Sequence, residues 1–293
     1  MKYLINIAIV AGIVCGSLLP ELYVYKGSIV YIVGFILVLN FFEIDFRWRN
    51  FFRFELVLTL LLSAVVIPLL YYLFLSRGLY PEYRIGILLT AIAPSGLMPL
   101  VLGRFFHNID HDLVLSNFLV TTFGAILYLP LMVKWLAGAD VSVPSTQLLY
   151  KTALMILLPY GTSLIMKRIF QGEKAEAVKR CSKPIVLALL FIICLLVASG
   201  ASQRLEWDLS LLHVIVLVFS VYLVQGGIAY FIGRFFWGLP VQRTLALISS
   251  SRNNQITLGI AILNFSPATA IPCIFGFIFH HITNALWLWL FRK

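Results

Sequence analysis

The stretch Ser249-Ser250-Ser251-Arg252-Asn253-Asn254-Gln255 places seven polar residues in succession inside an otherwise apolar segment, residues 241–263. That segment has the length of a membrane-spanning helix, which needs about 20 largely apolar residues. Lipid offers no hydrogen-bonding partners at this depth, so a run of polar side chains cannot face it. The run must line a cavity or pack against protein, and it is the first candidate for a functional site.

The composition of the whole chain indicates that most of it lies in lipid. Of the 293 residues, 61% are hydrophobic and 12% are charged, whereas soluble domains carry about 25% charged residues. This excludes soluble enzymes, nucleic-acid-binding proteins and secreted disulfide-rich modules. We attribute the net charge of +10 to basic loops that face the anionic cytoplasmic leaflet, so the expected partner is membrane lipid and not nucleic acid.

The hydrophobic pattern predicts an all-α membrane protein with ten transmembrane helices. All 12 acidic residues fall at the edges of apolar runs or between them, as expected where a central carboxylate would cost about 3 kcal/mol. The connections are short, and residues 171–183 form the most highly charged of them. The predicted spans are residues 3–19, 28–43, 54–75, 83–103, 113–136, 147–169, 184–201, 211–233, 241–263 and 268–290.

The basic residues predict the orientation of the chain. Most of the 22 Lys and Arg residues lie at the span ends that share a side with both termini, and Arg252 belongs to neither side. Cytoplasmic loops carry an excess of Lys and Arg. The sequence therefore predicts a multi-pass protein of the inner (plasma) membrane with both termini in the cytoplasm.

The ten predicted spans divide into two halves of five, residues 1–138 and 146–293, in a single transmembrane unit. Because each half has an odd number of spans, the second half is inverted relative to the first. This is the arrangement of inverted-repeat transporters. The similarity between the halves is one of hydropathy, since no strong residue-level repeat is evident.

The fourth span of the first half is interrupted at the position that corresponds to the polar stretch. Its middle reads Ala93-Pro94-Ser95-Gly96-Leu97-Met98-Pro99. Proline removes a backbone donor and clashes with the preceding turn, so a kinked or unwound helix is expected. Paired interruptions of this kind indicate a binding site at the bilayer midplane. The alternative is an ordinary proline kink in one span and a polar packing seam in the other.

With these features the chain resembles the bile acid:sodium symporter family, within the wider bile acid/arsenite/riboflavin transporter superfamily. The most specific similarity lies in residues 252–261, a polar patch followed by a small-residue apolar helix. Others are the motif around Pro94 and Asp112-Leu113-Val114-Leu115-Ser116, which is similar to the family's Asp-x-x-x-Ser. The resemblance covers essentially the full length of the chain.

The resemblance implies a fold and a function. In the implied fold, spans three to five and eight to ten form a core in which spans four and nine are unwound and cross. The remaining spans form a panel, and alternating access moves one domain against the other. The implied function is secondary active transport of an organic anion, bile-acid-like or a small carboxylate, by a protein that is not an enzyme.

This chain departs from the family pattern at positions that bear on sodium binding. Sodium-coupled members carry a glutamate and a glutamine in the ninth-span patch. With the patches aligned on Gly259, Arg252 occupies the glutamate position, and Leu97-Met98-Pro99 replaces a Ser-Asn pair. Hard cations prefer charged oxygen ligands, so sodium coupling stays open, and no other cofactor is expected. The candidate sodium ligands are Ser116, Asn117, Thr121 and Thr122.

Arg252 is the most informative single residue. An unpaired guanidinium at membrane depth is costly, and no acidic residue lies near it in sequence. It could fill the place that sodium occupies in relatives, or bind a substrate carboxylate through its bidentate fork. Both roles favour an anionic substrate. The alternative is an arginine that snorkels or pairs with a loop at a helix break.

Amide and hydroxyl groups complete the candidate substrate site. Asn253, Asn254 and Gln255 offer donors and acceptors to a substrate, although cross-helix hydrogen bonds would also account for them. Thr257 lies one turn further along the chain, and Ser95 lies at the break of the fourth span. Together with Arg252, these five residues are the predicted substrate-binding set.

Two other functions are considered. The segment His107-Asn108-Ile109-Asp110-His111-Asp112 has residue types that suit zinc, and a polytopic intramembrane enzyme acting on lipid could use it, but a solvated loop is the favoured interpretation. An arsenite-type exporter of the same superfamily would share the pair Asn253-Asn254. Such proteins use a cysteine around the fourth-span break, where this chain has none, and Cys273 is a poor substitute.

Overall fold

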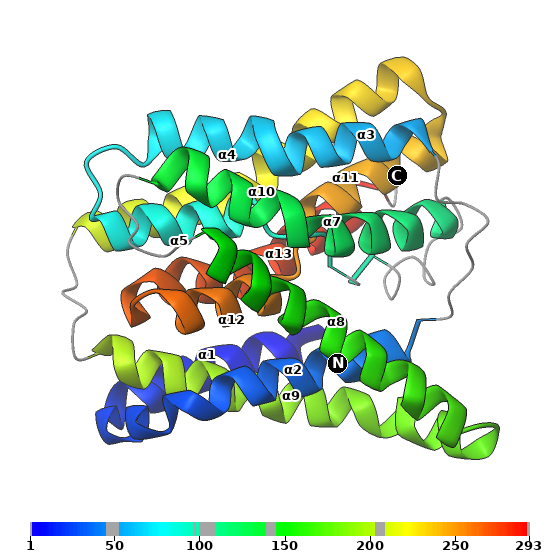
Figure 1. The fold of residues 1–293 in the computed structure, drawn as a ribbon. Helices are drawn as coiled ribbons and strands as arrows, with labels where there is room; N and C mark the ends of the chain where they lie inside the picture. Colours follow the sequence, from blue (N-terminus) through cyan, green and yellow to red (C-terminus); the bar gives the residue numbers. More distant parts are fainter. Residues whose placement is uncertain are drawn as a thin grey trace.

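The computed structural model describes residues 2–44, 53–96, 98–99, 109–138, 145–202 and 209–291, which are almost entirely helical (Figure 1). The prediction of an all-α membrane protein is confirmed in this respect. In chain order the elements are α1 (Lys2–Leu18), the 3₁₀ helix η1 (Pro20–Gly27), α2 (Ser28–Phe42), α3 (Phe54–Leu61), the π-helical turn η3 (Leu62–Val66), α4 (Ile67–Leu69), the π-helical turn η4 (Leu70–Leu75), α5 (Pro81–Ala91), α7 (His111–Ala137), α8 (Ser145–Ile169), α9 (Glu173–Ser202), α10 (Leu209–Phe236), α11 (Leu239–Ser250), α12 (Asn254–Asn264) and α13 (Pro267–Leu290).

Within the described part of the chain, seven helical segments are long and apolar enough to cross a membrane. They are Pro20–Phe42, Phe54–Leu75, His111–Ala137, Ser145–Ile169, Glu173–Gly200, Leu209–Phe236 and Pro267–Leu290. The other three predicted spans are shorter or interrupted. Ile7–Leu18 is a shorter apolar helix, α5 ends at Ala91, and residues 239–264 are divided between α11 and α12.

One predicted connection is wrong. Residues 171–183 were expected to form a loop, but α9 begins at Glu173 and runs through them without interruption. The charged residues of this segment are good helix formers. Glu173 and Glu176 lie in the first turn, where negative charge interacts favourably with the helix dipole. The helix therefore starts well before the apolar run that sequence hydropathy detects.

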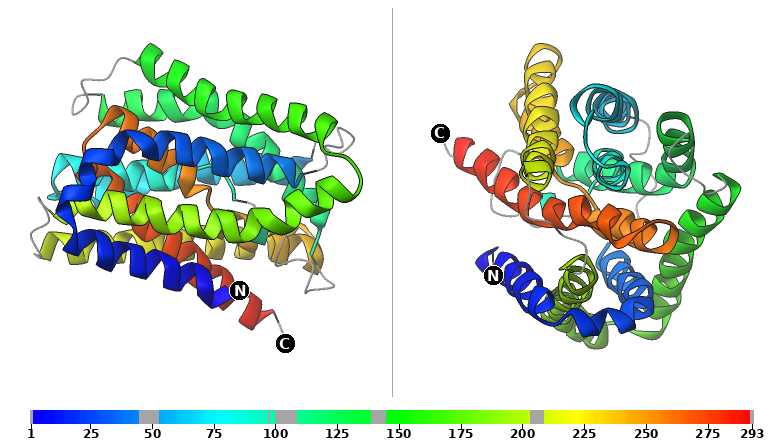
Figure 2. Two further views of the ribbon diagram at one scale, coloured as in Figure 1. Left: turned by 90° about the horizontal axis from the view of Figure 1, so that it is seen from below. Right: turned by 90° about the vertical axis from the view of Figure 1, so that its left-hand side faces the viewer.

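The helices form two layers, which the end-on view in Figure 2 separates. We name the layer of α1, α2, α8 and α9 the panel: α1 packs along α9, and α2 contacts both α8 and α9. We name the other layer the core layer. It contains α3 to α7 and α10 to α13, with α13 packed against α5 and α10. Small residues allow this packing, since a Cβ on Gly86 would lie only 2.4 Å from the backbone oxygen of Thr269.

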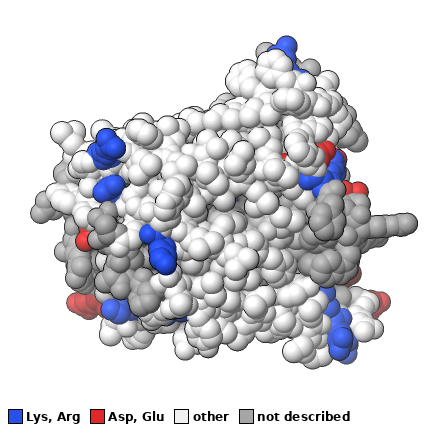
Figure 3. All heavy atoms as spheres, turned by 45° about the horizontal axis from the view of Figure 1, so that its top comes forward, with Lys and Arg blue, Asp and Glu red and all other residues white. Residues whose placement is uncertain are grey.

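Charged side chains lie mostly toward the two ends of the helices. Figure 3 shows a broad uncharged band between these ends on the face that it presents. The start of α1 and the end of α13 lie toward the same end of the helices (Figure 1). Such a surface suits lipid around the middle and water at both ends. The chain is a multi-pass membrane protein.

Candidate functional site

The polar stretch interrupts a helix, as predicted. α11 ends at Ser250 and α12 begins at Asn254. Between them the backbone of Ser251 is extended, with φ −110° and ψ 116°. A helix cannot continue through an extended residue, so the backbone groups near the break lack their usual helical partners. These groups are available for bonds to another part of the chain.

The fourth predicted span is interrupted at its proline motif. α5 ends at Ala91, and residues 93–96 are not helical. Pro94 has no backbone N–H to donate and disfavours a helical conformation in the residue before it. Met98 and Pro99 are helical again, whereas Leu97 lies outside the described residues.

The two interrupted segments pair with each other. Ser95 and Arg252 form an antiparallel bridge, in which Gly96 N donates to Ser251 O at 2.9 Å and Asn253 N donates to Pro94 O at 2.7 Å. The approach is close enough that a Cβ on Gly96 would lie 3.0 Å from the backbone oxygen of Arg252. Each break therefore satisfies backbone groups that the other exposes. We name this paired region the crossing.

The guanidinium of Arg252 lies inside the crossing, and only 2% of the residue is exposed. Its Nη1 donates to Ala93 O at 2.6 Å, and its Nη2 donates to Oε1 of Gln225 in α10. Gln225 is oriented in turn, because its Nε2 donates to Oγ of Ser63 at 3.0 Å. Arg252 thus connects the end of α5 to α10 and, through Gln225, to the π-helical turn η3.

Neutral dipoles, not a carboxylate, stabilise this buried charge. The ion pairs among the described residues do not include Arg252, and its Nε has no hydrogen-bond partner. Ala93 O lies just beyond the C-terminal end of α5, where unpaired carbonyls carry partial negative charge. Burying an ion costs several kcal/mol even after relaxation. The crossing therefore has a net positive charge that an anion would neutralise.

The amides of the predicted site point in different directions. Asn254 Oδ1 accepts from the hydroxyl of Tyr222 at 2.9 Å, but Asn254 Nδ2 and Asn253 Oδ1 are buried without a partner. Gln255 Oε1 accepts from Nδ2 of Asn40 in the panel at 3.0 Å. Thr257 donates to Asn254 O at 3.3 Å, within its own helix.

The predicted substrate-binding set is therefore only partly brought together, and Thr257 is buried within α12. Ser95, Arg252, Asn253 and Asn254 are brought together at or beside the crossing. Gln255 instead lies at the boundary between the two layers.

The four predicted sodium ligands lie on α7 beside the crossing, and all are buried. Thr121 Oγ1 accepts from Ser95 N at 3.0 Å and donates to Asn117 O at 2.7 Å. Asn117 Oδ1 accepts from Thr59 Oγ1 at 2.6 Å. Thr122 Oγ1 has no hydrogen-bond partner. With Ser116, the set offers hydroxyl and amide oxygens and no carboxylate, although hard cations prefer charged ligands.

A comparison with known protein families decides what kind of protein carries this site. Residues 27–206, more than half of the chain, match the model described as the Sodium Bile acid symporter family. The chain belongs to the sodium bile acid symporter family. It is therefore a membrane transporter. The matched residues include the α5 break and α7 but end before α10, so Gln225 and Arg252 lie outside the match.

Two relatives of this family member come from Bacillus subtilis (strain 168). The first is named as an uncharacterized sodium-dependent transporter, YocS, and is 23% identical over 292 residues, covering 96% of this chain and 88% of the relative. The second is an uncharacterized protein, YbaS, 24% identical over 211 residues, covering 71% of this chain and 68% of the relative. The similarity to YocS extends across both breaks.

Sequence reasoning missed several residues that this symporter-family member uses around its crossing. They are Gln225 and Tyr222 of α10, Ser63 of η3 and Asn40 of α2. Gln225 and Asn40 were detectable in principle, because each is a strongly polar side chain in an apolar helix. Their partners were not detectable, since Gln225 and Ser63 are separated by 162 positions in the chain.

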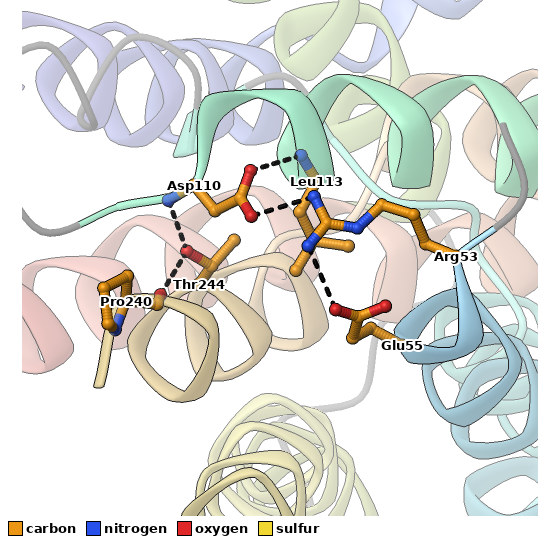
Figure 4. Close-up of polar contacts among 6 residues, drawn as sticks. All are labelled: Arg53, Glu55, Asp110, Leu113, Pro240 and Thr244. Carbon is orange, nitrogen blue, oxygen red and sulfur yellow. Dashed lines mark hydrogen bonds and ion pairs between the residues drawn. The ribbon is translucent and has the colours of Figure 1, made fainter. Parts of the chain in front are cut away.

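A second polar cluster lies at one end of the core layer (Figure 4). Arg53 donates to Glu55 Oε1 at 3.0 Å and pairs with Asp110 Oδ2 at 2.8 Å. Asp110 caps α7 by accepting from Leu113 N at 2.9 Å, and its own N–H donates to Thr244 Oγ1 at 2.9 Å. Burial lowers the pKa of Arg53, but the hydrogen bonds and charges of Glu55 and Asp110 outweigh this and raise it. We name this cluster the clasp, because it ties the starts of α3, α7 and α11 together.

The clasp corrects the interpretation as a solvated loop for residues 109–112, the described part of the segment 107–112. Asp110 is half-buried and bonded on both sides, because a carboxylate before the first helical turn satisfies backbone donors that the helix leaves free. His111 and Asp112 begin α7 and are exposed, whereas His107 lies outside the described residues. Within the described residues no group of three or more His, Cys, Asp or Glu side chains could hold a metal ion.

Substitution of Asp110 by Ala is expected to destabilise the transporter by about 1–2 kcal/mol, the usual effect of losing a helix cap. Asp112→Ala is the matched control, since Asp112 is an exposed carboxylate in the same turn, and its substitution should change stability by no more than about 0.5 kcal/mol. Thermal unfolding of both variants in detergent measures the difference. Equal melting temperatures would show that the clasp contributes nothing to stability.

Proposed function

We propose that this transporter carries an organic anion, bile-acid-like or a small carboxylate, by secondary active transport with alternating access. The observation that carries this proposal is the buried guanidinium of Arg252, which has no carboxylate partner among the described residues. In a medium of low dielectric constant, an anion gains far more from such a charge than it would in water. A cationic substrate would be repelled by it.

The proposed substrate site is formed at and beside the crossing. Arg252 supplies the positive charge, and the buried, unpartnered Asn253 Oδ1 and Asn254 Nδ2 supply an acceptor and a donor for the polar groups of a substrate. Ser95 holds the two segments in register, because its Oγ donates to Ile248 O at 3.1 Å. Thr257 and Gln255 extend the site along α12.

We further propose ten transmembrane spans in two inverted repeats, residues 1–138 and 146–293, with spans four and nine broken and crossing. The interruptions fall in the fourth predicted span of each half, after α5 and between α11 and α12, which supports this topology. The distribution of Lys and Arg supports cytoplasmic termini in the inner (plasma) membrane.

In the alternating-access cycle, the panel and the core layer move relative to each other. Polar contacts between described residues join the two across their boundary. Asn40 Nδ2 donates to Gln255 Oε1 at 3.0 Å, and Lys151 Nζ donates to Leu263 O at 3.1 Å, at the C-terminal end of α12. Relative motion of the two layers would have to break these contacts and form others.

A thermal-shift screen of the purified protein tests the proposed substrate class. Small carboxylates and taurocholate, each paired with a neutral analogue of the same size, are tested with and without sodium. A ligand that binds only the folded state stabilises it by about 2.7 kcal/mol at a hundredfold excess over its Kd. We expect at least one anion to raise the melting temperature while its neutral analogue does not. Stabilisation by neutral analogues alone would contradict the proposal.

Adding arsenite to the same thermal-shift screen tests whether the protein is an arsenite-type exporter of the superfamily. Cys273 is buried against α5, with its Sγ 3.7 Å from Thr90 Oγ1, so the fold brings a thiol closer to the fourth-span break than the sequence suggests. Stabilisation by arsenite that is lost in Cys273→Ser would favour that branch over an organic anion.

A further inference from the structure

The guanidinium of Arg252 is a fixed cation buried at the crossing. We propose that this arginine is a built-in cation that replaces sodium at the crossing, so that anion binding does not require sodium. The inference rests on the proposed function as an anion transporter. It concerns the source of the positive charge in the site and not the identity of the substrate.

The first argument is the set of oxygens that the guanidinium already uses. Ala93 O lies beyond the end of α5, and Oε1 of Gln225 faces it from α10; each accepts a hydrogen bond from a different Nη of Arg252. Backbone and amide oxygens of this kind are typical ligands for a hard cation. Here the chain itself satisfies them.

The second argument concerns the predicted sodium ligands on α7. The side-chain oxygens of Thr121 and Asn117 already accept hydrogen bonds within the core layer. Thr121 Oγ1 accepts from Ser95 N, and Asn117 Oδ1 accepts from Thr59 Oγ1. The set supplies no carboxylate that would compensate the loss of a cation's water. Thr122 Oγ1 is buried without a partner, but a neutral hydroxyl does not supply the charged oxygen that a hard cation prefers, so the set does not fit a sodium ion as it stands.

The third argument is electrostatic. Thr121 Oγ1 accepts from the backbone N–H of Ser95, two residues along the chain from Ala93, whose carbonyl oxygen binds the guanidinium of Arg252. A sodium ion held by Thr121 would therefore lie close to a buried positive charge that no described carboxylate neutralises. Like charges repel strongly in a medium of low dielectric constant. The arginine thus disfavours sodium at the place where the sequence offered ligands for it.

The test measures the sodium response of the purified full-length protein. Melting temperature without ligand, and then the affinity for taurocholate and benzoate, are compared in sodium chloride and in choline chloride at equal ionic strength. We expect the same melting temperature in both salts and affinities that agree within about twofold. A higher melting temperature in sodium, or an affinity raised about tenfold by it, would overturn the inference.

Variants locate the effect in Arg252. In choline chloride, Arg252→Ala should weaken anion binding by about thirtyfold or more, and millimolar guanidinium should restore part of it. Arg53→Ala is the control, because it removes an arginine from the clasp and should leave anion binding and the response to guanidinium unchanged. If Arg252→Ala binds the anion as tightly as the unaltered protein, the crossing needs no cation and the inference is wrong.

The two proposals fail in distinguishable ways. Absence of binding by any anion in either salt would contradict the proposed substrate class. Sodium dependence of the melting temperature, which is measured without any anion, would contradict only the built-in cation.

Discussion

Replacement of Arg252 by Ala is expected to abolish saturable uptake of the transported anion. Among the described residues, this side chain is the one positive charge at the crossing. Only 2% of the residue is exposed to solvent. Removing one member of a buried charge interaction costs about 2–5 kcal/mol. This corresponds to a loss of about thirtyfold or more in affinity. Uptake into proteoliposomes measures the effect.

Two controls separate loss of charge from loss of fold. Arg84→Ala removes another arginine of the core layer, one that lies 4.5 Å from the ring centroid of Tyr72, and should retain uptake. Arg252→Lys retains the charge but not the two-point contact with Ala93 and Gln225, so partial uptake is expected. Undiminished uptake by a folded Arg252→Ala protein would remove the arginine from the mechanism.

A covalent link between the panel and the core layer should stop transport reversibly. Asn40 Nδ2 lies 3.0 Å from Gln255 Oε1 across the layer boundary. A short bifunctional thiol reagent should therefore cross-link cysteines placed at these two positions. If the layers must move relative to each other, the linked protein should lose at least about tenfold in rate, and reduction of a cleavable linker should restore it.

The unaltered protein is the control for this experiment, because it contains four free cysteines of its own. It should retain uptake after the same treatment, and each single-cysteine variant should keep after treatment the uptake that it shows before treatment. Full activity of the doubly substituted, linked protein would mean that transport proceeds without motion at this boundary.

Much of the fold could be predicted from the sequence, because an apolar run of about 20 residues marks a helix that crosses the lipid. The predicted span 54–75 agrees with the helical segment Phe54–Leu75. The error at residues 171–183 has a physical cause. Hydropathy detects where lipid begins, whereas the charged start of α9 continues as a helix in water.

Part of the candidate site was also predictable. Seven polar residues in an apolar run, and the proline motif around Pro94, each predict a broken helix on local grounds. The pairing of Ser95 with Arg252 is a contact across 157 positions that was not predicted. Only the crossing of the two spans was expected, and that expectation came from the family resemblance. Patterns within each segment do not indicate which residues of the two segments lie opposite each other.

The partners of Arg252 illustrate what could not be predicted. Gln225 is unusual in its helix, but nothing in its own segment indicates that it faces Arg252 on one side and Ser63 on the other. The clasp was missed for the same reason. Arg53 and Asp110 precede α3 and α7, and Thr244 lies in α11, so no local pattern in any of the three segments predicts their contact.

A crystal structure of the transporter with a brominated organic anion would test the central claim most directly. We predict an anomalous bromine peak for an anion whose carboxylate lies beside Arg252 and the amides of Asn253 and Asn254, at the crossing. An anion bound only on the lipid-facing surface or within the panel, with the crossing free of it, would contradict the account.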